Sequence, residues 1–262
     1  MNVPRTMTRV LQTLALALGI VLIAAVTFFV LSLSGRQAIA DGFESGGARI
    51  IKDGSGSVGL LTIGAREVAL VDAGTDRSGK AILAELSRRG LGRDAVKAIL
   101  LTHGHPDHVA AAPLFPQAEI MALEPEADLI EGRARARGPL TRWLPARPGA
   151  MRVGRVLHDG ETVTLGTMSV RAFAVPGHTA GSAAYLVGGM LFLGDSADAR
   201  SDGRVQGATW VFSDDTARNR ASLARLVGRL RNEEPAVHTL VFAHSGVLTR
   251  GLEPLAALAE AR

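Results

Sequence analysis

The chain has 262 residues, of which 47% are hydrophobic, and its formal net charge is +4. That length allows one large domain or two small ones, with ample apolar material for a core. Cysteine is absent, which excludes disulfides, thiolate metal ligands and a lipid-modified bacterial N-terminus. Three basic residues, Arg5, Arg9 and Arg36, flank an N-terminal apolar run, and the rest of the chain is close to neutral. Because no globally basic surface is indicated, we expect no nucleic-acid partner.

Residues 10–33 form a long, uncharged apolar run. As a helix this run would be about 36 Å long, and a bilayer's hydrocarbon core is about 30 Å thick. We therefore expect residues 1–36 to be an uncleaved, single-pass membrane anchor, since signal-peptide cores are usually only about 7–15 residues long. The pattern Ala38-Ile39-Ala40 supports the alternative, a signal peptide cleaved near Ala40 and a secreted protein. Arg5 and Arg9 favour a cytoplasmic N-terminus, with the rest of the chain extracytoplasmic or periplasmic.

Residues 48–262 are predicted to form one domain after a linker at residues 37–47. Apolar runs between turn signals predict strands at residues 48–51, 58–63, 67–71, 96–101, 119–123, 153–157, 162–165, 169–175, 183–187, 190–193 and 239–242. Helical spacing and capping residues predict helices over residues 78–89, 109–114 and 214–230. Residues 124–150, which are rich in Pro and Arg, are expected to be a partly helical insertion, and residues 197–213 a second irregular segment.

The heptapeptide THGHPDH at residues 102–108 holds three of the seven histidines. His103 and His105 follow a predicted strand, whose period of two turns both side chains to the same side. Pro106 suits the first turn of a helix, so Asp107 and His108 face back from the turn that opens it. One turn can thus offer two imidazoles to one cation, and a carboxylate with an imidazole to a second.

Three later residues complete a candidate ligand set. His178 in PGHTAGS, Asp195 in LFLGDS and His244 in LVFAHSG each follow a predicted strand. Zinc prefers about four N, O or S ligands, so the heptapeptide needs such partners. Strand ends are rigid places to mount ligands, and glycines near them let the backbone turn beneath an ion.

The motif HxHxDH, followed by PGHTxGS, GDS and a late His before Gly, resembles the metallo-β-lactamase-fold hydrolase superfamily. The resemblance extends from about residue 48 to residue 246 and includes ALVDAG, in which Asp72 closes an early strand. It implies an α+β fold, an αββα sandwich with the site at one edge between two sheets and residues 48–262 as the catalytic domain. It further implies a first metal on His103, His105 and His178, a second metal on Asp107, His108 and His244, and Asp195 as the bridge between them. Asp72 would orient the loop or a ligand histidine.

The resemblance implies two Zn²⁺ ions, with Fe or Mn as alternatives, and a metal-bridging hydroxide that attacks an ester, lactone, thioester or amide of a small molecule. Asp107 is the expected catalytic residue, which orients the nucleophile and passes a proton to the leaving group. The set with Asp195 is similar to that of glyoxalase II and the lactonases. The short chain after His244 makes a glutathione thioester an unexpected substrate, because glyoxalase II continues into a helical domain. An iron-dependent oxidoreductase resembling sulfur dioxygenases, a β-lactamase and a binding domain with a vestigial site are the alternatives.

Other conspicuous side chains have simpler expected roles. His158 and His238 lie outside every motif and are expected to be surface or structural residues, and Tyr185 to pack in the core. Three aromatic side chains either line a substrate cleft or cover an edge of the core: Trp143, Trp210 and Phe212. The arginines within residues 133–147 are expected to be solvated, with anion binding as the alternative.

Overall fold

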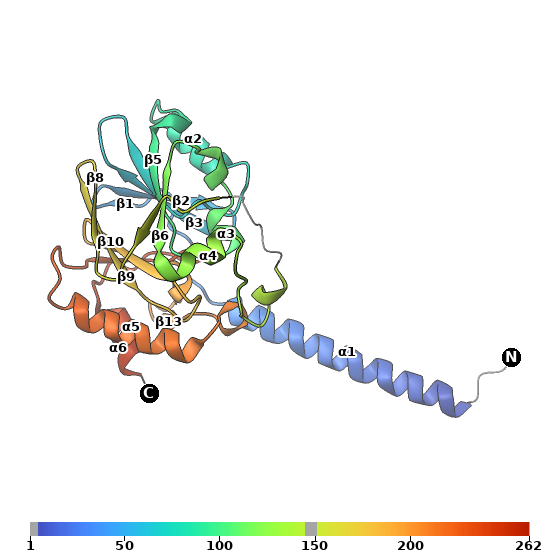
Figure 1. Ribbon diagram of the computed structural model, residues 1–262. Coiled ribbons are helices and arrows are strands. Elements are labelled where there is room, and N and C mark those ends of the chain that lie inside the picture. The colour runs from blue at the N-terminus through green and yellow to red at the C-terminus, as the bar shows by residue number, and fades with distance from the viewer. Residues whose placement is uncertain (1–4, 145–150, 262) are drawn as a thin grey trace. The chain divides into compact units, whose positions relative to one another are not determined.

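The computed structural model describes residues 5–144 and 151–261 and divides the chain into two compact units, residues 1–35 and 36–262 (Figure 1). The first unit is the helix α1 (Arg5–Leu33). Within it, Leu11–Leu33 has a mean hydropathy of 2.9 and is long and apolar enough to cross a membrane, although a signal sequence has the same properties. The side chains of Arg5 and Arg9, on which the expected orientation depends, lie outside the described residues.

Two mixed β-sheets form the body of the second unit. The first has the order β1-β2-β3-β4-β5-β6-β7, antiparallel from β1 to β4 and parallel from β4 to β7. Its strands are β1 (Glu44–Ser45), β2 (Ala48–Asp53), β3 (Gly56–Thr62), β4 (Val68–Val71), β5 (Val96–Leu100), β6 (Glu119–Leu123) and β7 (Arg155–Leu157). The second has the order β14-β11-β10-β9-β8, parallel only between β11 and β14. Its strands are β8 (Thr162–Leu165), β9 (Met168–Ala174), β10 (Ala183–Val187), β11 (Met190–Phe192) and β14 (Thr239–Val241).

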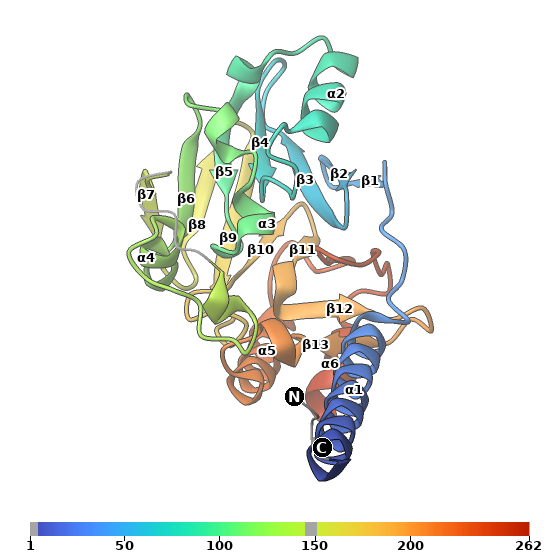
Figure 2. The same ribbon diagram turned by 90° about the vertical axis from the view of Figure 1, so that its right-hand side faces the viewer.

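Helices cover the outer faces of the sheets, so the layers run helix, sheet, sheet, helix (Figures 1 and 2). The helices are α2 (Lys80–Arg88), α3 (Pro106–Val109), α4 (Ala127–Ile130), α5 (Thr216–Leu230) and α6 (Glu253–Glu260). Ile82 and Leu86 of α2 bury against the first sheet, and Leu223 and Leu226 of α5 against the second. β4 and β10 are buried along their whole length because a helix layer and the opposite sheet cover their two faces. The layered α+β sandwich expected from the sequence is therefore confirmed.

The structure departs from the predicted helices and strands in several places. The helix expected at 109–114 is instead α3 followed by a 3₁₀ turn at Ala112–Leu114, because Ala110 and Ala111 donate their N–H groups to Gly74 and Ala73 instead of continuing the helix. Residues 197–213, expected to be irregular, contain a hairpin of β12 (Ala197–Ala199) and β13 (Val205–Gly207). The helix α6 was not predicted, and it begins with Pro254 in its first turn and buries Leu255.

Residues 37–47 were expected to be a linker, but they form backbone hydrogen bonds with the rest of their unit. Glu44 pairs with Arg49, and Gly42 and Phe43 exchange backbone hydrogen bonds with Ile50. Gln37 donates its N–H to the carbonyl of Ala199. β1 therefore extends the first sheet by one short strand.

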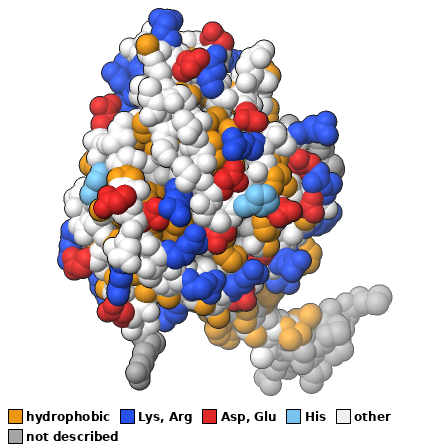
Figure 3. Space-filling view, turned by 60° about the vertical axis from the view of Figure 1, so that its left-hand side comes forward, with side chains coloured by type: hydrophobic (Ala, Val, Ile, Leu, Met, Phe, Trp, Pro, Cys, Tyr) orange, Lys and Arg blue, Asp and Glu red, His pale blue; other side chains and the backbone are white. Residues whose placement is uncertain are grey.

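Basic and acidic side chains intermingle on the face of the molecule shown in Figure 3. This distribution matches the near-neutral charge of the sequence after Arg36. The histidines that the heptapeptide gathers are buried, so they contribute little to such a surface.

Tyr185 joins the two sheets through a single buried hydrogen bond. Its side chain is fully buried, as expected, and its hydroxyl donates to the carbonyl of Leu101 at 2.8 Å across the sandwich. We predict that Tyr185→Phe lowers the free energy of unfolding by about 1–3 kcal/mol, because it leaves a buried carbonyl without its partner. Urea unfolding measures this change. Thr164→Val removes an exposed hydroxyl from β8 and is the control, with an expected change below about 0.5 kcal/mol; equal effects of the two substitutions would contradict the prediction.

Candidate metal centre

The seven candidate residues lie on segments that follow strands of both sheets. His103 and His105 follow β5, and Asp107 and His108 belong to α3, which starts directly after them. The three later residues follow strands of the second sheet: His178 after β9, Asp195 in the 3₁₀ turn after β11, and His244 after β14. The structure brings all seven together in three overlapping groups that have metal-ligand geometry.

Three imidazole nitrogens converge in the first group. His103 Nε2 lies 3.1 Å from His105 Nδ1 and 3.1 Å from His178 Nε2, and the latter two atoms are 2.9 Å apart. All three side chains are buried. A tetrahedral ion with Zn–N bonds of about 2.0–2.1 Å holds its nitrogen ligands roughly 3.3 Å apart. The three nitrogens therefore fit around one cation.

The second group adds two carboxylates. Nε2 of His244 lies 3.2 Å from Oδ2 of Asp107 and 3.3 Å from Oδ1 of Asp195, and Nε2 of His108 lies 3.2 Å from the same Asp195 oxygen. Oδ2 of Asp195 lies 3.6 Å from Nε2 of His178 in the first group. The Asp195 carboxylate thus turns one oxygen toward each group, as a residue shared by two ions does.

Two buried atoms at this point have no hydrogen-bond partner among the described residues: Nε2 of His108 and Oδ1 of Asp195. Buried polar atoms nearly always have partners, so unpaired ones call for an explanation. Both atoms point to the same place, and a cation there satisfies both at once. The residues present therefore fit a metal ion.

Neighbouring groups fix the orientation of the histidines. Nδ1 of His108 donates to Oδ2 of Asp72 at 2.8 Å, and Nδ1 of His244 donates to the carbonyl of Ser55 at 2.9 Å. Nδ1 of His178 lies 3.0 Å from Oγ of Ser213. A proton on the outer nitrogen leaves the lone pair of the inner nitrogen for an ion.

Asp72 has a strained backbone that fits this orienting role. Its φ of 61° is the one positive value for a non-glycine residue within the described ranges. Its Oδ1 accepts the backbone N–H of Thr102 at 2.7 Å, beside the heptapeptide, while Oδ2 holds His108. Such strain is typical of functional sites and persists where surrounding contacts fix the residue. The expected role of Asp72 in orienting a histidine agrees with these contacts.

The two groups differ in the charge they favour. Burial, helped by the charges of neighbouring histidines, lowers the pKa of His103 well below its ordinary value, and burial lowers the pKa of His178 to about 3. Burial opposes the charged form of His244 as well, yet Asp195 and Asp107 raise its pKa to about 10. Burial also acts against ionisation of Asp107, but His108 and His244 hold the pKa of this carboxyl at about 2. The first group therefore offers neutral imidazoles, and the second is an environment that stabilises positive charge.

Glu126, which the sequence did not mark as functional, joins the two loops that carry the first group. Its carboxylate is buried and accepts the N–H of Gly104 at 2.8 Å, the hydroxyl of Thr179 at 2.8 Å and the N–H of Gly181 at 2.8 Å. Gly104 stands between His103 and His105, and Thr179 follows His178. Burial raises the pKa of Glu126 to about 7, against the effect of these three donors. Since Glu126 lies in the insertion and matches no motif, only its acidic type in an apolar setting would have marked it.

We predict that Glu126→Gln loosens the first group of histidines. Both carboxylate oxygens accept N–H or O–H donors, so an amide must turn its NH₂ toward at least one of them and leave it without an acceptor. The expected cost is about 1–3 kcal/mol in the free energy of unfolding and a loss of metal affinity of roughly 10–100-fold. Metal titration and urea unfolding of the variant measure both. Glu124→Gln, which alters an exposed side chain in the same turn, is the control; unchanged affinity in Glu126→Gln would contradict the positioning role.

The remaining conspicuous residues are not among the converging ligands. His158 has a largely exposed side chain, and His238 donates to or accepts from Thr239 and contacts the carbonyl of Gly188. Trp143 is 79% exposed and Trp210 55% exposed, so neither covers the core to any large extent. Residues 145–150 of the insertion lie outside the described residues.

The profile of the metallo-beta-lactamase superfamily matches residues 51–244. The chain belongs to this superfamily, and its centre is a His/Asp site typical of the superfamily's metal-binding sites. The match covers every one of the seven converging residues.

The proteins similar to this chain have different names and activities. An uncharacterized protein of Bacillus subtilis (strain 168), YobT, is 32% identical over 162 residues, which cover 56% of this chain and 64% of that protein. A hydroxyacylglutathione hydrolase of Aeromonas hydrophila is 35% identical over 129 residues, covering 49% of this chain and 42% of that enzyme. The chain thus spans less than two thirds of either relative. Among solved structures, the Rm3 metallo-beta-lactamase has a TM-score of 0.63 at 22% identity, covering 87% of this chain and 94% of that one, which is a likeness of fold.

Proposed function

We propose that the protein is a dinuclear metallo-hydrolase that cleaves an ester, lactone, thioester or amide bond of a small molecule. His103, His105 and His178 would hold one Zn²⁺ ion, and Asp107, His108 and His244 the other. The observation that carries the proposal is the Asp195 carboxylate, whose two oxygens face the two groups. When bound, two such ions lower the pKa of a shared water and stabilise negative charge that develops on the substrate.

The chain's own residues supply orientation and proton transfer. Asp72 and Ser55 hold His108 and His244 so that their Nε2 atoms face inward. The side chain of Asp107 is 44% exposed, against 15% for Asp195, so Asp107 is the carboxylate that a substrate can reach. Its low pKa keeps it ionised, so that it can accept a hydrogen bond from a nucleophilic water and orient that water. We propose that the same carboxylate also passes a proton to the leaving group.

An iron-dependent oxidoreductase and a β-lactamase remain the competing functions. Histidine and carboxylate ligands accept iron as well as zinc, and a B3 metallo-β-lactamase shares the fold. The similarity to hydroxyacylglutathione hydrolases supports hydrolysis over oxidation. Metal analysis of the purified protein, coupled to lactone, thioester, β-lactam and phosphodiester assays and to oxygen consumption, separates these functions.

We predict that Asp195→Ala abolishes turnover and prevents simultaneous occupancy of both groups, because it removes the shared carboxylate. Metal content and the rate on the best substrate of the panel measure the two effects. Asp202→Ala, a change on the exposed β12–β13 turn, is expected to leave both unchanged. Full activity in Asp195→Ala would contradict the two-metal mechanism. Bound iron together with oxygen uptake in the wild-type protein would show that it is an oxidoreductase and not a hydrolase.

We also propose that α1 is an uncleaved anchor of an exported protein, and contacts of the residues just after it support this. The guanidinium of Arg36 lies 2.8 Å from the buried carboxylate of Asp198, which also accepts the hydroxyl of Ser245, the neighbour of His244. Gly246 donates its N–H to the carbonyl of Gln37 at 3.0 Å. Cleavage after Ala40 would remove Arg36 and Gln37 from beside the second group of ligands.

The charge on Asp198 makes this loss costly. Even beside Arg36, burial raises the pKa of Asp198 to about 6, which means that its ionised form is already held at a cost. Removing one partner of a buried ion pair destabilises a protein by about 3–5 kcal/mol. A mature chain that begins after residue 40 would bear that cost next to His244.

We predict that residues 41–262 are less stable than residues 36–262 by about 3–5 kcal/mol near neutral pH. Urea unfolding of the two fragments measures the difference, and Arg36→Ala in the longer fragment is expected to reproduce most of it. In cells, peptides from residues 11–35 are expected in the membrane fraction together with the catalytic domain. A mature N-terminus at Asp41, found by N-terminal sequencing, would show instead that the signal-peptide alternative holds.

A further inference from the structure

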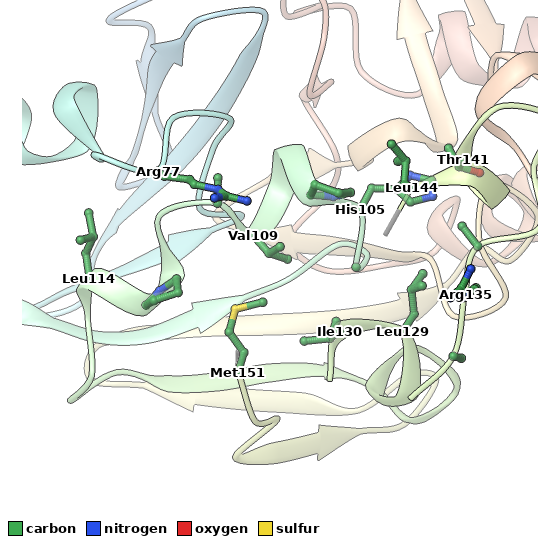
Figure 4. Close-up of a pocket in the computed structure, with 16 residues that line it drawn as sticks. Arg77, His105, Val109, Leu114, Leu129, Ile130, Arg135, Thr141, Leu144 and Met151 are labelled. Carbon is green, nitrogen blue, oxygen red and sulfur yellow. The ribbon is translucent and has the colours of Figure 1, made fainter. Parts of the chain in front are cut away.

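A cavity of about 340 Å³ lies beside the first group of histidines (Figure 4). Its walls come from the α3 region and from the insertion 124–144 with Met151, and most of its area is apolar. Representative lining side chains are Val109, Leu114, Leu129, Ile130, Leu144 and Met151. Small-molecule sites usually have volumes of roughly 300–1,000 Å³ and a few fixed polar groups on apolar walls. None of the hydrogen bonds described so far is made across this cavity.

His105 is a polar residue of the cavity wall. Its Nδ1 faces His103 and His178, while its other ring nitrogen, Nε2, is buried without a hydrogen-bond partner, and the residue lines the cavity. With the lone pair of Nδ1 directed to the first group, the ring proton is on Nε2. The cavity wall therefore includes an imidazole whose N–H group is buried and has no hydrogen-bond partner among the described residues.

Two arginines add positive charge at the ends of the cavity. Arg77 and Arg135 line it from opposite sides, as Figure 4 shows, and both are exposed. Neither forms an ion pair with any acidic side chain in the described ranges. Arg133 of the same insertion differs in this respect, because it pairs with Asp128 and Glu131. Unpaired guanidiniums beside an apolar wall suit a carboxylate carried on an alkyl chain.

We propose that this cavity binds the acyl part of the substrate and that this part is an alkyl chain of medium length that carries a carboxylate. The chain lies against the apolar wall, of which the ring of His105 is part, and the carboxylate pairs with Arg77 or Arg135. This assignment of the substrate class rests on the proposed hydrolase function. The binding itself does not, because the cavity and its polar groups exist whether or not a bond is cleaved.

The test uses the metal-loaded full chain in nanodiscs, with empty nanodiscs as the blank, and the probes butanoate, hexanoate, octanoate and octanol. Calorimetric affinity for the carboxylates is expected to rise about three- to fourfold per added methylene. Ala134→Trp fills the cavity from a half-exposed position and is expected to weaken octanoate binding at least tenfold. Ala224→Trp, on an exposed position of α5 outside the cavity, is the matched control and is expected to change nothing.

The arginines have a test of their own. Arg77→Gln and Arg135→Gln together are expected to weaken octanoate severalfold and to leave octanol unchanged, while Arg218→Gln on α5 affects neither. Affinity that does not depend on chain length, or equal losses in Ala134→Trp and Ala224→Trp, would overturn the proposal. Esters of the same series of acyl lengths, measured in parallel, keep the two ideas apart. Hydrolysis that does not depend on acyl length would refute the cavity and leave the hydrolase, whereas chain-length-dependent binding without any hydrolysis would refute the hydrolase and leave the cavity.

Discussion

The arrangement of the centre is explained by the attraction of buried imidazole nitrogens and carboxylate oxygens for positive charge. Five imidazoles and two carboxylates meet within a few ångströms, and most of them have little access to water. Burying so many polar groups is costly unless each finds a partner. The nitrogens of the first group approach one another at distances that suit ligands of one ion, and the unpaired atoms of His108 and Asp195 add a second position. Bound cations would give all of these buried groups a partner at once. The loops must therefore hold the side chains in fixed positions.

The two sheets fix these positions, because the loops that carry the ligands follow strands of both sheets at one edge of the sandwich. Asp72, Ser55 and Ser213 orient individual imidazoles, and Glu126 joins the heptapeptide loop to the loop that carries His178. Each of these groups comes from a different part of the chain, so the orientation of the centre depends on the whole domain. Tyr185 makes a similar connection beneath the centre by linking the two sheets.

Much of this was predictable because the information is local. The strand-ending histidines, the prolyl helix start and the glycines beside later ligands are properties of short segments, and the resemblance of those segments placed the sandwich and the seven residues together. The rest depends on contacts between distant segments. Glu126 contacts the site only because Gly104 and Gly181 donate to it, and α3 is short because Gly74 and Ala73 accept the N–H groups of the residues that follow it. Arg36 likewise pairs with Asp198, a residue far away in the sequence. No period or motif encodes such pairs.

The spacing of the converging residues along the chain has a consequence for biogenesis. The first group needs His178, and the second needs His244, which follows the last strand β14. A ribosome must therefore release the chain at least through His244 before the centre can assemble, and a chain that crosses a translocon unfolded cannot carry its ions along. For an exported protein, metal loading then belongs to the destination compartment, and the metal supply there, more than that of the cytoplasm, decides which ion the enzyme acquires.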